Sequence, residues 1–334
     1  MSALPQRRLG GATVAAIGYG CMELSHAYGT PPRAEDARRV LDRALDLGVT
    51  HFDTAALYGF GKNESLLGEW LHAHRHQVHL ASKCGMTGVD GRRVIDGRPA
   101  TLKRTLAEAL QRLRTDVIDL YYLHRWDKQV PIEDSVGALA DMVQAGHVRE
   151  IGLSEVSAAT LRKAHAIHPI AAVQTEYSLW TRNAEIAVLD ECLRLGAAYV
   201  AFSPLARGFL ADSIADPADF VPKDIRAGMP RFQAPNWGHN AALLPSWRAL
   251  AAEAGCTAAQ LALAWLLAKG PHIIPIPGTT SVAHLEENVG AADVVLDADL
   301  IARAEALINP HTVSGPRYPA GTQAEIDTEE IGGA

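Results

Sequence analysis

The chain has few cysteines, and each stands alone. They are Cys21, Cys84, Cys192 and Cys256. They form no CxxC pair and have no metal-ligand spacing, so the sequence predicts neither a disulfide framework nor a metal site. Single thiols of this kind are typical of reduced cysteines in a cytosolic protein. We therefore expect a cytoplasmic location.

The sequence also lacks a targeting segment, long apolar runs and clusters of cations. MSALPQRRLG at 1–10 has no apolar core for a signal peptide, and no stretch of about 18 apolar residues could span a bilayer. The net charge of -7 is unfavourable for nucleic-acid binding, which draws most of its affinity from clustered cations. We expect no membrane or nucleic-acid partner, and the oligomeric state is not encoded in any recognisable pattern.

Apolar runs of strand length alternate with stretches of helical spacing along the whole chain. Strands are expected at 50–55, 78–83, 117–124, 150–155, 171–177, 198–204 and 272–278. Helices are expected between them, for example at 34–48, 101–114, 133–146 and 184–196. This alternation predicts parallel strands with helical crossovers, arranged as an open doubly wound sheet or a closed barrel.

The barrel is the preferred arrangement. No GxGxxG follows an early strand, as an open dinucleotide-binding sheet would require. An eighth strand is expected within LALAWLLAK at 261–269, although an apolar run of this kind is also compatible with a helix. Eight strands would close a (β/α)8 TIM barrel, and barrels of 334 residues are commonly one domain. We therefore expect a single α/β barrel domain over 1–334.

Three segments lie outside the regular alternation. RRLGGATVAAIGYG at 7–20 predicts a β-hairpin turned by Gly10 and Gly11, which could plug the bottom of the barrel. The connection at 206–240 is too long for a simple turn and carries aromatic residues, which favours a lid. The segment from 310 to 334 reads as an irregular C-terminal arm.

Four polar residues fall at or just after predicted strand ends. They are Asp53, Tyr58, Lys83 and His124. In a barrel the carboxyl ends of the strands face one another, so these side chains can meet although they are far apart in sequence. A Lys83 ammonium near Tyr58 should lower the pKa of the phenol, and Asp53 can keep the lysine charged. With His124 orienting an oxygen, the group could protonate a carbonyl that receives a hydride from a cofactor.

Motifs along the chain resemble the aldo-keto reductase family. FDTAALYG, ASKCG, YYLHRWD, IGLSE, AFSPLARGFL and IPIPGTT followed by LEEN are similar, in order and spacing, to signatures of the longer-looped bacterial branch. The match runs from RRLG at 7–10 to RYP at 317–319. The resemblance implies a barrel that binds a nicotinamide cofactor and reduces aldehydes and ketones. It also implies that Asp53, Tyr58, Lys83 and His124 are the catalytic tetrad, with Tyr58 as proton donor.

The same resemblance implies a set of cofactor contacts. Ser154 and Gln174 would bind the nicotinamide carboxamide, and Phe202 would stack on the ring. The pyrophosphate would lie at Ser203, Leu205, Arg207 and Gly208, and the adenosine end at Gly278, Thr279, Glu287 and Asn288. Thr280, Ser281 and His284 occupy positions where NADPH-preferring relatives often carry Lys or Arg. Because hydroxyls bind a phosphate more weakly than cations do, we expect NADP(H) to be favoured only modestly over NAD(H).

The sequence indicates only the general character of the carbonyl substrate. Aromatic and apolar residues on loops expected near the tetrad are Met22, Tyr28, Trp126, Trp180 and Trp237. They would suit an apolar or aromatic aldehyde or ketone. Two alternatives stay open: a cofactor-binding regulatory subunit, since the family includes channel auxiliary subunits, and a Schiff-base lyase that uses Lys83 as the nucleophile.

Overall fold

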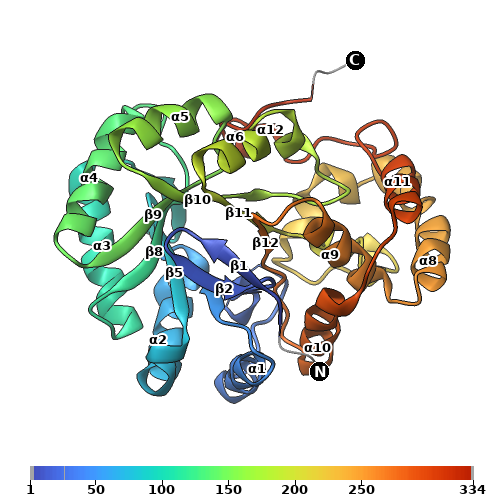
Figure 1. Ribbon diagram of the computed structural model, residues 1–334, viewed down its shortest axis with the longest axis horizontal. Coiled ribbons are helices and arrows are strands. Elements are labelled where there is room, and N and C mark those ends of the chain that lie inside the picture. The colour runs from blue at the N-terminus through green and yellow to red at the C-terminus, as the bar shows by residue number, and fades with distance from the viewer. Residues whose placement is uncertain (1–3, 26, 332–334) are drawn as a thin grey trace.

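The computed structural model describes residues 4–25 and 27–331. Its central sheet contains eight parallel strands in the order β3-β4-β5-β8-β9-β10-β11-β12. Their bounds are β3 Tyr19–Gly20, β4 His51–Asp53, β5 His79–Cys84, β8 Ile118–Leu123, β9 Val148–Ser154, β10 Ile170–Glu176, β11 Ala198–Phe202 and β12 Ile273–Pro275. Helices surround these strands (Figure 1).

Hydrogen bonds between the first and last strands close the sheet into a barrel. The Gly18 N–H donates to the Pro275 carbonyl at 2.9 Å, and the Gly20 N–H donates to the Pro277 carbonyl at 3.2 Å. The two chains approach so closely that a Cβ on Gly20 would lie 2.8 Å from the Ile276 carbonyl oxygen. The predicted (β/α)8 barrel is therefore confirmed.

Helices connect successive strands, and α10, α11 and α12 follow the last strand. The helices are α1 Ala34–Asp46, α2 Lys62–His74, α3 Pro99–Leu113, α4 Ile132–Gln144, α5 Ala158–Ile167, α6 Val188–Leu195, α7 Asn236–Ala241, α8 Leu244–Glu253, α9 Ala258–Ala268, α10 Val282–Gly290, α11 Ala298–Leu307 and α12 Ala320–Gln323. No single helix in the described part of the chain is long and apolar enough to cross a membrane, although α7–α8 and α9, bent by 76° from one another, pass the length and composition test together.

The seven strands predicted from apolar runs are confirmed, but the predicted eighth is wrong. Residues 261–269 belong mainly to α9, whose N-terminus carries a capping box: Thr257 accepts from the Gln260 N–H, and the Gln260 side chain accepts from the Thr257 N–H. Burial around the whole helix removes the helical period from the sequence. The eighth strand of the sheet is the two-residue β3, which follows the hairpin.

The predicted N-terminal hairpin is present as β1 (Gln6–Leu9) paired antiparallel with β2 (Ala12–Ala15). Leu9 and Val14 pack with residues from the strand interiors, including Leu120 and Val200. The Gly11 N–H also donates to the Glu150 carboxylate at 2.7 Å. The hairpin thus covers the end of the barrel where the strands begin, and it lies in front of the strands in Figure 1.

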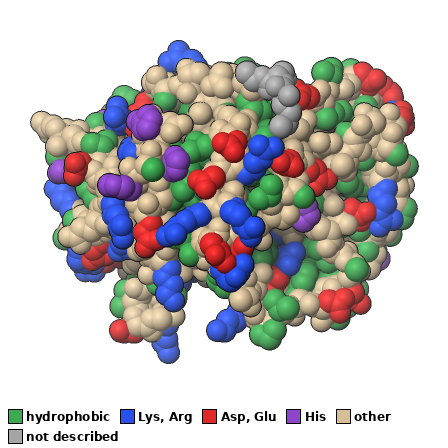
Figure 2. Space-filling model, turned by 90° about the horizontal axis from the view of Figure 1, so that it is seen from below, with side chains coloured by type: hydrophobic (Ala, Val, Ile, Leu, Met, Phe, Trp, Pro, Cys, Tyr) green, Lys and Arg blue, Asp and Glu red, His purple; other side chains and the backbone are tan. Residues whose placement is uncertain are grey.

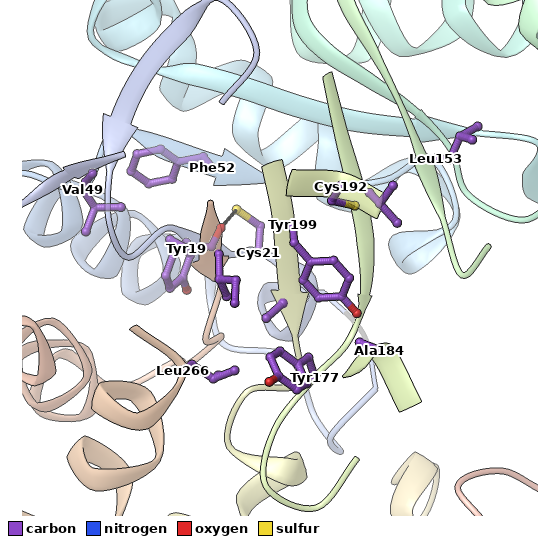
Figure 3. Close-up of a cluster of buried hydrophobic side chains, with 14 of the residues drawn as sticks. Tyr19, Cys21, Val49, Phe52, Leu153, Tyr177, Ala184, Cys192, Tyr199 and Leu266 are labelled. Carbon is purple, nitrogen blue, oxygen red and sulfur yellow. Dashed lines mark hydrogen bonds between the residues drawn. The ribbon is translucent and has the colours of Figure 1, made fainter. Parts of the chain in front are cut away.

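A large apolar core lies between the strands and the surrounding helices. Figure 3 shows part of it, with Tyr19 and Phe52 on one side and Tyr177 and Tyr199 on the other. All four side chains are fully buried. On the face shown in Figure 2, acidic and basic side chains lie beside one another.

The long connection after β11 is a folded cover. It contains several 3-10 turns and α7, and Trp180 stacks on its Phe209 with ring centroids 4.0 Å apart. Phe232 and Trp237 stack 6.0 Å apart in the same cluster. We call residues 206–240 the β11 loop.

The C-terminal arm is irregular, as predicted, apart from the short α12. It is tied to the start of α5, where the Asp327 carboxylate accepts hydrogen bonds from the Ser157 hydroxyl at 3.0 Å and the Thr160 hydroxyl at 2.6 Å. An acidic side chain is favourable at a helix N-terminus, so this contact fixes the arm on the barrel rim.

Candidate active site

The carboxyl ends of three neighbouring strands bring the four predicted catalytic residues together. Asp53 is the last residue of β4, Lys83 is the second-to-last residue of β5, and His124 directly follows β8. Tyr58 begins a short 3-10 turn, η2 (Tyr58–Gly61), just beyond β4. The rings of Tyr58 and His124 meet edge to face with centroids 6.0 Å apart. A proton donor, a cation and an imidazole therefore share one small volume.

Lys83 is the centre of this group. Its fully buried ammonium forms an ion pair with Asp53, donates to the Thr54 carbonyl at 2.8 Å and donates to the Tyr58 hydroxyl at 3.3 Å. Burial alone would lower the pKa of Lys83, but the Asp53 carboxylate raises it, and the net shift is upward. Lys83 is therefore charged at neutral pH.

Burial raises the pKa of Tyr58, and the Lys83 ammonium opposes this rise without reversing it. Lys83 lowers the pKa of Tyr58 as expected, but the net shift is upward because loss of solvent outweighs the nearby cation. The consequence is chemical. At neutral pH the Tyr58 hydroxyl keeps its proton and can donate it to an oxygen that gains negative charge.

His124 is neutral at physiological pH. Burial lowers the pKa of its imidazole well below the ordinary value, and the neighbouring Arg125 and Lys83 charges lower it further. Its Nδ1 is buried without a hydrogen-bond partner in the described part of the chain. A neutral imidazole can still donate one hydrogen bond, so His124 can orient a substrate oxygen without adding charge.

One cavity of about 650 Å³ is lined both by members of this group and by residues of α10. Asp53, Tyr58 and His124 line it at one end. All the residues that the resemblance assigned to the cofactor also line it; they are Ser154, Gln174, Phe202, Ser203, Leu205, Arg207, Gly208, Gly278, Thr279, His284, Glu287 and Asn288. A volume of this size suits a drug-sized or cofactor-sized ligand.

The predicted nicotinamide contacts lie beside the tetrad. The Gln174 amide donates to Asp53 at 2.7 Å, while its neighbour Ser154 accepts a hydrogen bond from Arg125 at 3.2 Å. Phe202 is only partly buried and lines the cavity with its ring. This arrangement offers two polar side chains and one aromatic face within the same cavity wall.

Arg207 does not extend freely into the cavity. Its guanidinium makes a bidentate ion pair with Glu176 at 2.8 and 2.6 Å, and the side chain is 7 % exposed. Glu176 also accepts from Arg317 of the C-terminal arm at 2.9 Å. One carboxylate at the end of β10 thus joins the β11 loop to the arm.

The predicted adenosine end lies at the start of α10. Gly278 and Thr279 precede this helix, and Ser281 caps it by accepting from the His284 N–H at 3.4 Å. Thr280 and Ser281 are not among the described residues that line the cavity, whereas His284 is. The helix N-terminus and the Thr279 hydroxyl are suited to an anionic group.

Two of the five residues predicted to contact the substrate lie in the wall of the cavity. Met22 and Tyr28 line the cavity. Trp126, Trp180 and Trp237 are not among the described residues of its wall. Trp180 and Trp237 pack against the aromatic residues of the β11 loop, and Trp126 donates to the Val130 carbonyl at 2.8 Å. Apolar packing holds Trp180 and Trp237 away from the cavity, and a local hydrogen bond holds Trp126 away from it.

Other residues at this end were missed. Arg125 lies next to His124 in the wall, and Arg93 reaches the wall from a hairpin of β6 (Met86–Val89) and β7 (Arg92–Ile95). The Asp90–Gly91 pair, in which both residues have positive φ, is a strong hairpin signal. That signal could have revealed the hairpin, but not that Arg93 reaches the cavity.

The chain is similar to known proteins over nearly its whole length. The sequence model of the Aldo/keto reductase family matches residues 16–309. The chain is 42 % identical over 332 residues to "Aldo-keto reductase yakc [NADP(+)]" of Schizosaccharomyces pombe, with 97 % of each chain covered. It is 39 % identical over 338 residues to "Aldo-keto reductase str7" of Strobilurus tenacellus, with 98 % of this chain and 99 % of the relative covered.

A solved structure has a similar fold. The glycerol dehydrogenase AKR11B4 from Gluconobacter oxydans aligns with a TM-score of 0.83 and 27 % sequence identity. The alignment covers 94 % of this chain and 98 % of that protein.

Proposed function

Because the chain belongs to the aldo/keto reductase family, we propose that it reduces an aldehyde or ketone to the alcohol, reversibly and with NADP(H). The observation that carries the proposal is the Tyr58 hydroxyl, which lies 3.3 Å from the Lys83 ammonium in the wall of a cofactor-sized cavity. Tyr58 acts as general acid in reduction and as general base in alcohol oxidation.

Each member of the tetrad has a separate role in this proposal. The neutral His124 imidazole orients the carbonyl oxygen, and Tyr58 delivers its proton to that oxygen. Lys83 stabilises the tyrosinate that is left, while Asp53 keeps Lys83 charged and fixed. A reduced nicotinamide cofactor, when bound, supplies the hydride.

The cavity wall fits a nicotinamide dinucleotide. Gly208 and Gly278 have no side chain to obstruct a bound ligand, and Ser154, Gln174 and Asn288 offer hydrogen-bonding groups along the wall. The NADP(+) in the name of the fission-yeast relative supports NADP(H) as the favoured cofactor. With Thr280, Ser281 and His284 at the adenosine end in place of Lys or Arg, we propose that the preference over NAD(H) is modest.

The alternative of a Schiff-base lyase is disfavoured by the state of Lys83. A nucleophilic lysine must be deprotonated, but the Asp53 carboxylate raises the pKa of Lys83. A cytoplasmic location is supported by four free cysteines, three of them buried. A regulatory subunit would share the same cavity and is tested by the turnover experiment below.

The direct test is a carbonyl panel assayed with NADPH and with NADH. We expect cofactor oxidation with at least one aldehyde or ketone, and a higher kcat/KM with NADPH. Separate titrations of each reduced cofactor by protein fluorescence give the binding preference. Cofactor binding without turnover on any carbonyl in the panel would contradict the proposed reaction and favour the regulatory alternative.

A further inference from the structure

Four arginines line the cavity, and three of them have an acidic partner. Arg93 pairs with Glu325, Arg207 with Glu176, and Arg226 with Asp224. Each acidic partner neutralises its guanidinium locally. For Arg125, the described residues 4–25 and 27–331 provide no carboxylate within 4.0 Å.

Arg125 is also buried, with only 9 % of its surface exposed. Its Nη1 donates to the His124 carbonyl at 2.7 Å and to the Ser154 hydroxyl at 3.2 Å. The Nε is buried without a partner, and within the described chain the Nη2 makes no hydrogen bond either. A guanidinium nitrogen that has no protein partner can donate a charge-assisted hydrogen bond to a carboxylate.

A buried cation without a counter-ion is costly, and proteins usually neutralise it. The nearby Asp53 is not a counter-ion for Arg125. It is paired with Lys83 and also accepts a hydrogen bond from Gln174. The charges that act on His124 from its surroundings are the cations Arg125, Lys83 and Arg93. Lys83 is paired with Asp53 and Arg93 with Glu325, so among these three cations only Arg125 has no carboxylate partner in the described part of the chain.

We propose that Arg125 binds an acidic group of the substrate, so that the preferred substrate is an aldehyde or ketone that also carries a carboxylate. The proposal rests on the proposed function and narrows its substrate class. Arg125 lies next to His124, which places the anion site beside the residue that orients the carbonyl oxygen. The carboxylate would supply the missing counter-charge and accept a hydrogen bond from the free Nη2.

The test compares each carboxylate with a neutral compound of nearly the same shape. The 2-, 3- and 4-carboxybenzaldehydes are assayed against the corresponding formylbenzamides. For wild type we expect kcat/KM to be about tenfold or more higher for the acid in at least one pair, the range for a charge-assisted hydrogen bond. A ratio near one in all three pairs overturns the proposal, and this result needs no variant.

Arg125→Gln should reduce the acid-to-amide ratio to about one while changing the amide much less, and Arg125→Lys should retain part of the ratio. Arg104→Gln, an exposed arginine on the outer face of α3, is the control and should keep the wild-type ratio. Equal losses for acid and amide in Arg125→Gln would mean that Arg125 acts on the reacting oxygen or the cofactor, which contradicts an anion site.

Binding measurements test the anion site at Arg125 separately from the proposed carbonyl reduction. Benzoate and benzamide are titrated into NADP⁺-loaded protein by fluorescence. Tighter benzoate binding that is lost in Arg125→Gln supports the anion site even if no carbonyl is reduced, in which case only the reductase proposal falls. Equal binding of the two compounds in wild type overturns the anion site even if carbonyls are reduced.

Discussion

The Lys83 ammonium lies 3.3 Å from the Tyr58 hydroxyl, and the same ammonium is paired with Asp53. Lys83 thus connects a buried carboxylate to the proton donor. The Asp53–Lys83 ion pair should affect both catalysis and stability, because it is buried away from solvent.

Replacing Lys83 with methionine should therefore impair both properties. We expect kcat to fall by about 100-fold or more, because the tyrosinate loses its stabilising charge. Stability should fall by about 3–5 kcal/mol, because Asp53 is left buried and unpaired. Urea unfolding and steady-state kinetics measure the two effects.

The double variant Asp53→Asn/Lys83→Met separates the two effects. It removes both charges, so most of the lost stability should return while the activity stays low. A double variant as unstable as Lys83→Met alone would show that the ion pair is not the source of the stability loss.

Glu176 should make stability depend on acid pH. Burial alone would raise the pKa of Glu176, but Arg207 and Arg317 lower it well below its ordinary value. A depressed pKa gives stability that is present above the unfolded pKa of about 4.5 and is lost as the pH falls. Between about pH 7 and pH 3, Glu176 should account for about 2 kcal/mol of the lost stability.

Urea unfolding of Glu176→Gln at both pH values tests this. The variant should be less stable at neutral pH, and its difference from wild type should shrink in acid. Glu253→Gln removes an exposed partner of Arg303 and serves as the matched control with a small effect. A constant difference between wild type and Glu176→Gln across pH would contradict the account.

Glu23 should weaken cofactor binding as the pH rises. Burial raises the pKa of Glu23 to about 7, although Arg226 lowers it. Its carboxyl oxygen lies 3.4 Å from where a Cβ of Gly278 would be, in the wall of the same cavity. Above its pKa the carboxylate would repel an anionic cofactor, so we expect affinity to fall about two- to fivefold from about pH 6 to pH 8.

NADH is the probe for this prediction, because it lacks the 2′-phosphate that titrates near the same pH. Fluorescence titrations of wild type and Glu23→Gln should differ in their pH dependence, with the variant nearly flat. The same pH dependence in both proteins would exclude Glu23 as its source.

Closure of the barrel should depend on Gly20. A Cβ there would lie 2.8 Å from the Ile276 carbonyl oxygen, on the last strand's side of the junction. Gly20→Ala should cost about 1–3 kcal/mol by overpacking. Gly137→Ala, in α4 with open space around it, should be neutral or stabilise by about 0.5–1 kcal/mol. Thermal unfolding of both variants measures the contrast, and equal effects would contradict it.

The sequence predicted the barrel because buried parallel strands leave unbroken apolar runs. It failed at β3 and α9 for opposite reasons: Tyr19–Gly20 is too short to show a period, and α9 is buried around its circumference. The capping-box residues Thr257 and Gln260 were the local signal that could have identified the helix.

The sequence placed the four tetrad residues at strand ends, which the barrel then brings together. It could not give the net pKa shift of Tyr58, because burial depends on packing of the whole cavity. Nor could it show that Arg207 is paired with Glu176 while Arg125 has no carboxylate partner among the residues that the structure describes, since these contacts join residues from separate strands and loops.

The most direct test of the whole account is the turnover of Tyr58→Phe with NADPH and a carbonyl that wild type reduces. The substitution removes one hydroxyl and leaves the ring. We expect kcat to fall by about 100- to 10,000-fold, while the Kd for NADPH measured by fluorescence stays within about twofold of wild type. Undiminished carbonyl reduction by Tyr58→Phe would contradict the role of Tyr58 as the proton donor.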